Sequence, residues 1–438
     1  MGAILTCGIA ANAQWLRQAT AFAKPSRGIS QIVIVDANTS WAIAYDGSGA
    51  GAPTRDFTRT SNGGTLWKAD SVKATPAIDP NNQIAAITAI SKDTAWVSLF
   101  GNGTSIGGVY RTNDGGMTWT KQATATYNAG SFEDWIYFWD KNNGVAFGDP
   151  NTTNWEIYYT TNGGTTWTAV PAANLPTVGA GQWGVTGVFS VAGGAAYGGT
   201  NYGAVLKSVD MGVHWTASTV HGGSQIDKVV FKDANNGMAV VGPNNDSIYT
   251  TTNGGTSWTY VPKTGRFLTS GLAYASGLNG GSYVCTGAAT GMVGTSFSTN
   301  NGATWQAMDT LKQHTAVSFM GTTGWTGSFD SSSTVGGIYK WMGMPFAINE
   351  IQPVYQTGLS VYPNPNNGTF QIALSNFTGN QTQITVYDLV GNLVFESSEN
   401  TAGNLYVKEV DLTAYPTGMY IVRVQDGAKV YTAKAIRQ

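Results

Sequence analysis

Short apolar stretches interrupted by Asp, Asn and Gly recur along most of the chain. In residues 138–148, and again in 231–242, an apolar stretch leads into an Asp-x-Asn-Asn-Gly segment, and a second apolar stretch rich in small residues follows. Asp and Asn side chains accept hydrogen bonds from nearby backbone N–H groups, and Gly adopts the positive φ that tight turns need. The pattern therefore predicts pairs of β-strands joined by tight turns.

A second pattern, called the box below, occurs six times. It consists of Ser or Thr, Asp or Asn two residues later, Gly two residues further on, and Trp three residues after the Gly, with successive Trp residues 43 to 52 positions apart. Each box predicts a hairpin turn whose Trp enters the apolar layer. Leu66 and His214 replace the Ser or Thr that precedes Trp elsewhere, so we expect looser turns there. The structural Asp or Asn and Trp residues are Asn62, Trp67, Asp114, Trp119, Asn162, Trp167, Asp210, Trp215, Asn253, Trp258, Asn300 and Trp305.

Together the two patterns give four strands per unit, which is the size of a propeller blade. Seven units are predicted, and the seventh lacks a box and a fourth strand. Residues 14–20, which include Trp15, read as an unpaired fourth strand. We therefore predict that they complete the seventh blade and close the ring, because closure removes exposed strand edges. First strands are expected near Ile29, Gln83, Phe132, Trp183, Ile226, Leu268 and Thr315.

Composition agrees with an all-β chain. Of 438 residues, 57 are Gly, 12% are aromatic and only 11% are charged, which excludes a disordered chain and a helical bundle. The net charge of −2, without a Lys/Arg cluster, argues against nucleic-acid binding. No apolar run reaches the ~20 residues of a membrane-spanning helix.

Four segments follow from these patterns. Residues 1–13 read as the remnant of a secretory signal peptide, because an apolar run precedes Ala-Asn-Ala, although a buried strand is the alternative. Residues 14–342 form the propeller and 343–357 a linker with two prolines. Residues 358–438 alternate apolar and polar positions between turns, which predicts a small β-sandwich. Once Cys7 leaves with the signal peptide, Cys285 has no disulfide partner.

The boxes resemble the Asp-box (BNR) repeats of sialidases, sortilin-type receptors and xyloglucan hydrolases, and the Asp…Asn-Gly turns look like those of the Ycf48-like group. This resemblance covers residues 14–342 and implies a seven-bladed β-propeller. In such families the boxes are structural and lie away from the active face.

The C-terminal segment resembles the type A C-terminal sorting domain of the type IX secretion system of Bacteroidetes. That resemblance implies recognition by an outer-membrane translocon and a shuttle protein, and secretion across the outer membrane to the cell surface or medium. A generic Ig-like adhesive domain is the alternative. The matching residues include Tyr362, Pro363, Asn364, Pro365, Gly368, Asp388, Gly391, Gly418, Tyr420 and Lys434.

Candidate site residues concentrate in the third unit, in the loops opposite the boxes. Glu133, Asp134 and Asp149 are candidate catalytic residues, because glycoside hydrolysis needs two facing carboxyls. The same residues could instead only solvate the surface or cap turns. Aromatic and amide side chains suited to sugar rings are nearby, and we expect them to be exposed. These candidate ligand-binding residues are Trp135, Asn151, Asn154, Trp155, Trp183 and Tyr202.

The predicted function is that of an exported binding or adhesion protein whose propeller face binds a glycan or surface polymer. A glycoside hydrolase that uses the third-unit carboxyls is one alternative, and a protein-binding scaffold is another. No cofactor is predicted. The three His residues lie far apart in sequence, which disfavours a metal centre, and calcium at Asp/Asn-rich loops such as 142–143 or 244–246 is the alternative.

Overall fold

The computed structural model describes residues 14–101, 107–128, 131–151, 153–242, 247–343, 358–375, 381–400, 405–427 and 429–438. The chain divides into two compact units, Met1–Pro345 and Phe346–Gln438. The predicted signal peptide, most of the predicted linker and the loop 244–246 lie outside the described residues. Among the described residues there is no helix long and apolar enough to cross a membrane.

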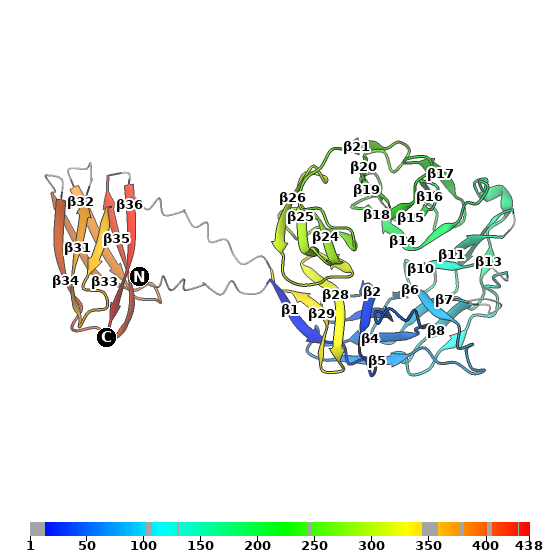
Figure 1. Ribbon diagram of the computed structural model, residues 1–438, viewed down its shortest axis with the longest axis horizontal. Helices are drawn as coiled ribbons and strands as arrows, with labels where there is room; N and C mark the ends of the chain where they lie inside the picture. The colour runs from blue at the N-terminus through cyan, green and yellow to red at the C-terminus, as the bar shows by residue number, and fades with distance from the viewer. Residues whose placement is uncertain are drawn as a thin grey trace. The chain divides into compact units, whose positions relative to one another are not determined.

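The first unit is a ring of four-stranded antiparallel blades (Figure 1). Its described residues form seven blades, and every predicted first strand begins within three residues of the expected position. One short 3₁₀ helix, Ala172–Asn174, follows blade 3.

The strands of blade 1 are β2 (Arg27–Ile34), β3 (Ser40–Asp46), β4 (Asp56–Thr60) and β5 (Trp67–Ser71); those of blade 2 are β6 (Gln83–Ala89), β7 (Ala95–Phe100), β8 (Gly108–Thr112) and β9 (Thr120–Lys121). Blade 3 contains β10 (Glu133–Phe138), β11 (Gly144–Pro150), β12 (Trp155–Thr160) and β13 (Thr168–Ala169). Blade 4 contains β14 (Gly184–Ala192), β15 (Ala195–Thr200), β16 (Ala204–Ser208) and β17 (Thr216–Thr219).

Blade 5 contains β18 (Ile226–Phe231), β19 (Gly237–Val241), β20 (Ser247–Thr251) and β21 (Thr259–Val261). Blade 6 contains β23 (Gly271–Ala275), β24 (Ser282–Ala289), β25 (Met292–Ser298) and β26 (Thr304–Asp309), and β22 (Thr264–Gly265) adds a parallel strand beside β26. Blade 7 contains β27 (Val317–Met320), β28 (Thr323–Ser332), β29 (Val335–Trp341) and, from the other end of the unit, β1 (Trp15–Ala19).

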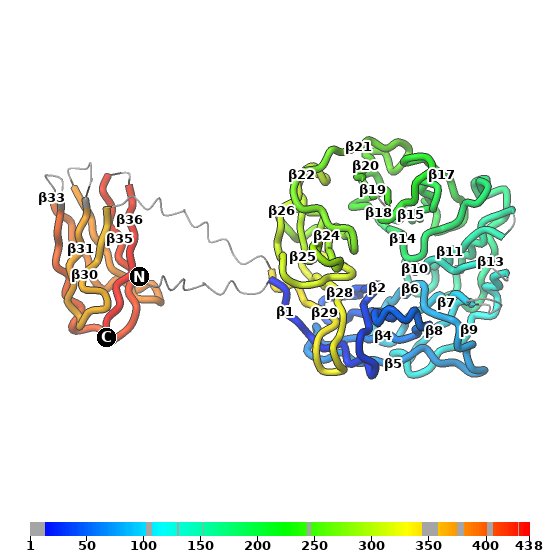
Figure 2. Tube along the Cα trace, in the orientation of Figure 1, coloured from blue at the N-terminus to red at the C-terminus, as the bar shows by residue number. Residues whose placement is uncertain are grey.

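The predicted closure of the ring is confirmed. Strand β1 pairs antiparallel with β29, from Trp15 opposite Trp341 to Ala19 opposite Gly337, so blade 7 combines both ends of the unit (Figure 2). Trp15 is 2% exposed, and its indole N–H donates a hydrogen bond to Thr295 Oγ1 of blade 6 at 3.0 Å. The N-terminal strand therefore joins blade 7 and also packs on its neighbour.

All six boxes share one hydrogen-bond network. The Ser or Thr Oγ accepts a bond from the N–H of the Gly four residues later at 2.9 Å, and donates to Oδ1 of the Asp or Asn at 2.8–3.0 Å. That Oδ1 also accepts the N–H of the residue before the Trp at 2.9–3.0 Å. The bonded Gly has φ between 82° and 90°, a conformation that favours Gly.

The looser turns expected at Leu66 and His214 are not found. Both residues donate their backbone N–H to the Asp or Asn at 2.9 Å, as Ser and Thr do in the other boxes. In addition, His214 Nδ1 lies 2.6 Å from Asp210 Oδ2, where Thr118 places its hydroxyl in another box. The prediction was wrong because the turn uses the main chain of this residue, so its side chain can vary.

The described residues of the second unit form two sheets. One contains β30 (Leu359–Tyr362), β31 (Thr369–Ser375) and β34 (Leu405–Asp411), and the other contains β33 (Leu393–Asn400), β32 (Gln381–Tyr387), β35 (Gly418–Asp426) and β36 (Lys429–Arg437). Phe370 and Ile372 of the first sheet belong to one core cluster with Ile384 and Val422 of the second. This is the predicted small β-sandwich.

Candidate functional site

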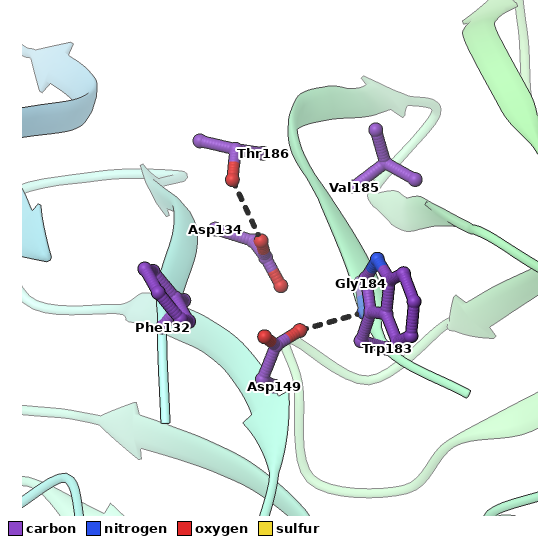
Figure 3. A pocket seen from close by; sticks show the side chains of 7 residues that line it. All are labelled: Phe132, Asp134, Asp149, Trp183, Gly184, Val185 and Thr186. Atoms are coloured by element: carbon purple, nitrogen blue, oxygen red, sulfur yellow. Dashed lines mark hydrogen bonds between the residues drawn. The ribbon is translucent and has the colours of Figure 1, made fainter. Parts of the chain in front are cut away.

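A pocket of about 470 Å³ opens between blades 3 and 4, at the end of the blades opposite the boxes. Its lining residues are Phe132, Asp134, Asp149, Trp183, Gly184, Val185 and Thr186 (Figure 3), and we call it the acid pocket. Two of the three predicted carboxyls meet there, Asp134 from β10 and Asp149 from the end of β11. A second pocket of about 490 Å³, the amide pocket, is lined by Pro150, Asn151, Thr153, Val178, Gly179, Ala180, Gly181 and Gln182.

Asp134 is the innermost acid of the pocket and is 1% exposed. Its Oδ1 accepts a hydrogen bond from Thr186 Oγ1 at 3.1 Å, whereas its Oδ2 has no donor among the described residues. Oδ2 points toward Asp149 (Figure 3), and a hydrogen bond between the two carboxyls requires a proton. Burial, and then the charge of Asp149, raise the pKa of Asp134 well above its usual range, so this side chain holds the proton.

Asp149 lies nearer the solvent. Burial raises its pKa to about 6, although the backbone N–H of Gly184, 2.8 Å from Oδ1, and the hydrogen bond from Asp134 both favour the charged form. The pair therefore carries one negative charge above pH ~6 and shares a proton, as expected for two adjacent acids. Gly184 is required by this contact, because a Cβ there would lie 2.0 Å from Asp134 Oδ2.

The third predicted acid, Glu133, is not among the residues that line the acid pocket. Its side chain is fully buried toward blade 2, where Gly107 would place a Cβ 2.6 Å from Oε2. Neither carboxyl oxygen hydrogen-bonds to another residue in the part of the chain that the structure describes. Burial raises the pKa of Glu133 to about 8, so its carboxyl is neutral at pH 7.

The rim of the two pockets is formed by adjacent loops of blade 4. Trp183 and Tyr202 are each 49% exposed, and the backbone N–H of Trp183 donates to Asn201 Oδ1 at 2.8 Å. Asn201 Nδ2 also donates to the carbonyl of Gly181, and the Tyr202 hydroxyl lies over that Gly. Two of the predicted aromatic residues are therefore half exposed to solvent beside the pockets.

Trp135 and Trp155 were expected to be exposed, and the structure corrects this. They are 1% and 3% exposed. Trp135 stacks on Phe147 and Phe189 with ring centroids 4.9 and 5.0 Å apart, and so joins blade 3 to blade 4. Inner strands of a propeller are covered on both faces by neighbouring blades, which leaves neither indole available to a ligand.

The predicted amides differ in their roles. Asn151 lines the amide pocket, but its Oδ1 accepts the N–H groups of Thr153 and Asn154, so it caps a turn. Its Nδ2 lies 3.5 Å from Glu156 Oε1, and this buried carboxylate also accepts bonds from Asn128. Asn154 is exposed outside both pockets.

Phe132, Gly184, Val185 and Thr186 line the pocket but were not predicted. The register of β14 against β15 shifts between Gly184 and Phe189, which takes Val185 and Thr186 out of the regular ladder. They are therefore placed to line the pocket beside blade 3. The only sequence signal is their position directly after Trp183, at a strand start.

In the second unit, the residues of the predicted sorting signal build turns and hold the last strand. Asn364 accepts the N–H of Ile436 at 2.8 Å and donates to the carbonyl of Lys434 at 2.6 Å. Asp388 caps the turn that contains Gly391. Tyr420 is buried, whereas Tyr362 is 46% exposed. The Tyr-Pro-Asn-Pro segment (362–365) is therefore fastened to the C-terminal strand.

Among the described residues, no group of three or more His, Cys, Asp and Glu side chains is placed to hold a metal ion. At 142–143 the backbone N–H groups of both Asn residues donate to Asp140 Oδ1, so the Asp140 carboxylate stabilises the turn.

Comparison with known families matches residues 360–438 to the secretion system C-terminal sorting domain. Among solved structures, YCF48 bound to D1 peptide is similar at 14% identity and TM-score 0.52, over 75% of this chain and 96% of that one. YCF48 from Cyanidioschyzon merolae is similar at 16% identity and TM-score 0.51, over 75% and 98%. A comparison with curated proteins finds no significant match.

These likenesses show a Ycf48-like propeller fold followed by a type IX sorting domain. The sorting domain marks the chain for secretion by the type IX system, to the cell surface or the extracellular space.

Proposed function

We propose that this exported propeller is a binding or adhesion protein that holds a glycan or surface polymer at the rim between blades 3 and 4. We further propose that the sorting domain engages the outer-membrane translocon and its shuttle protein. The single observation that carries the binding proposal is the exposed Trp183 at the mouth of the acid pocket. Aromatic faces of this kind stack on sugar rings, while nearby polar groups bind the hydroxyls.

Two neighbouring features support an extended ligand. The acid and amide pockets follow each other along the chain at 149–150 and 182–183, so one polymer could occupy both. Tyr202 offers a second exposed ring beside Gly181. The rim therefore presents two aromatic platforms with carboxyl and amide groups between them.

The hydrolase alternative has less support. A glycoside hydrolase holds its two carboxyls about 5–9.5 Å apart, because the sugar or a water molecule lies between them. Asp134 Oδ2 points toward Asp149 (Figure 3) and the two acids share one proton, whereas Glu133 is buried away from the pocket. The acids are better suited to ligand contact than to an acid–base pair.

The test is retention of the full chain on a panel of immobilised polysaccharides, with released sugars measured in parallel. We expect retention without hydrolysis, and loss of retention in Trp183→Ala. Tyr260→Ala is the matched control, because Tyr260 is an exposed aromatic (54%) on β21, away from this rim. Equal retention of both variants, or retention of neither the variants nor the parent, contradicts the proposal. Hydrolysis that is lost in Asp149→Asn would favour the enzyme.

A further inference from the structure

The residues of the acid pocket become more buried from its mouth to its floor, and the two deepest polar side chains are carboxyls. Trp183 is half exposed, Asp149 is partly buried, and Asp134 is 1% exposed with Oδ2 lacking a protein donor. No Lys or Arg is among the described residues that line it. Apart from the Asp149 carboxyl, nothing among the described residues bonds Oδ2, so once the shared proton leaves, two carboxylates face each other and the floor of the pocket favours a donor that comes from outside the chain.

The other acids near Asp134 all oppose its ionisation, although Glu133 itself is neutral at pH 7. Glu133 on β10 and Asp149 both raise the pKa of Asp134, and Glu156 on β12 raises that of Glu133. The positive charge of Lys121 lowers the pKa of Glu133, whereas no cation among the described interactions lowers that of Asp149. A proton now bridges the pair, and a compact cationic donor could replace it.

We propose that the ligand carries a primary ammonium group, as an amino sugar with a free amine does, and that this group binds between Asp149 and Asp134 while the sugar ring packs on Trp183. This inference rests on the proposed glycan-binding function and specifies its ligand class. The ammonium has three donors on one small centre, enough for Asp149 and for Asp134 Oδ2. It replaces the shared proton, which passes to solvent, and the nearby indole favours a cation.

A metal ion fits the pocket less well. The described acid pocket offers two carboxyls, and no group of three metal-binding side chains is found in the described residues. A neutral hydroxyl would also gain less, because it adds no positive charge beside the Asp149 carboxylate. An ammonium satisfies both the missing donor and the missing positive charge.

The experiment compares binding of the full chain to oligomers of glucosamine and of N-acetylglucosamine of equal length, at a slightly acidic pH where the free amine is protonated. We expect the free amine to bind about tenfold more tightly, the size of one charge-assisted hydrogen bond. Asp149→Asn should remove this preference. Asp93→Asn, on a turn at the box end, is the matched control and should keep it.

The outcomes separate the two proposals. Equal, Trp183-dependent affinity for both oligomers, or Trp183-dependent binding of other polysaccharides but of neither oligomer, overturns the ammonium inference and leaves glycan binding standing. A preference that persists in Asp149→Asn also overturns it. Absence of Trp183-dependent binding to any glycan overturns both. If Asp149→Asn melts below the parent, competition by free glucosamine against N-acetylglucosamine on the parent chain decides, and equal competition contradicts the inference.

Discussion

At the box end of the blades, the Ser or Thr, the Asp or Asn and the Gly of the box pattern bond to one another within their own turn, whereas at the opposite end of blades 3 and 4 some buried carboxyl oxygens lack protein donors. The six boxes share one network with almost constant distances. The other end has Asp134 Oδ2 and both oxygens of Glu133 without partners among the described residues. The first arrangement stabilises a fold, and the second is a cost that a ligand site can explain.

The largest effect is expected from opening the ring, which would disturb both ends together. Deletion of residues 14–20 removes the partner of β29 and the buried Trp15, so cooperative thermal unfolding of the propeller should be lost. Calorimetry measures this, with Leu16→Ala as the control because Leu16 is 47% exposed. An unchanged melting transition after the deletion would show that β1 does not close the ring.

The next effect concerns the unpaired acid end. The pKa of Glu133 is about 8 in the folded chain, well above its value of 4.5 when solvated. Between these pH values the folded state holds a proton that the unfolded state has lost. The free energy of unfolding should therefore fall by about 1.4 kcal/mol for each unit by which the pH rises over that range. Asp134 acts in the same direction, because its pKa is also raised.

Glu133→Gln should reduce this slope and make the chain more stable than the parent at pH 8. Denaturant unfolding at pH 5 and pH 8 measures both quantities, and Asp79→Asn on an exposed turn serves as the control. If the free energy of unfolding of the parent rises with pH across this range, the pKa of Glu133 is not raised, and its carboxyl must have a hydrogen-bond donor or contact with solvent.

A smaller effect is expected at the box end. Thr160→Val removes the oxygen that accepts from Gly164 and donates to Asn162, so the free energy of unfolding should fall by about 1–3 kcal/mol. Glycan affinity should stay unchanged, because the turn lies at the other end of blade 3. Thr168→Val, at an exposed position on β13, should have little effect on either. Weaker glycan binding by Thr160→Val would contradict the assignment of stability to the box end and of binding to the opposite end.

The smallest effect on stability is expected at the rim. Trp183 is half exposed, so Trp183→Ala should change the free energy of unfolding by less than about 0.5 kcal/mol. Trp167→Ala, in a box and 5% exposed, should cost several times more. Chemical unfolding of the two variants measures the contrast, and equal losses would place Trp183 in the core.

The two ends also differ in what the sequence can predict. The hydrogen bonds that all six boxes share join residues no more than four positions apart, so these residues predicted the turn, and Trp15 predicted the closing strand. The side chains at positions 66 and 214 wrongly predicted looser turns, because the turn uses the backbone N–H of these residues.

The acid pocket depends on contacts between blades. Loop position was enough to bring Asp134 and Asp149 together, but burial of Trp135 depends on Phe189 of the next blade. Thr186 reaches Asp134 because the register of β14 against β15 shifts, and no residue type in that segment predicts such a shift. Interblade packing therefore decided which predicted residues reached the site.

Amide hydrogen exchange of the full chain, with and without a retained polysaccharide, tests the central claim most directly. The account predicts slower exchange at residues 181–186, including the Gly184 N–H that bonds Asp149, and at 149–151, with the box turns unchanged. Protection centred on the box turns, or on another pair of blades, would contradict it.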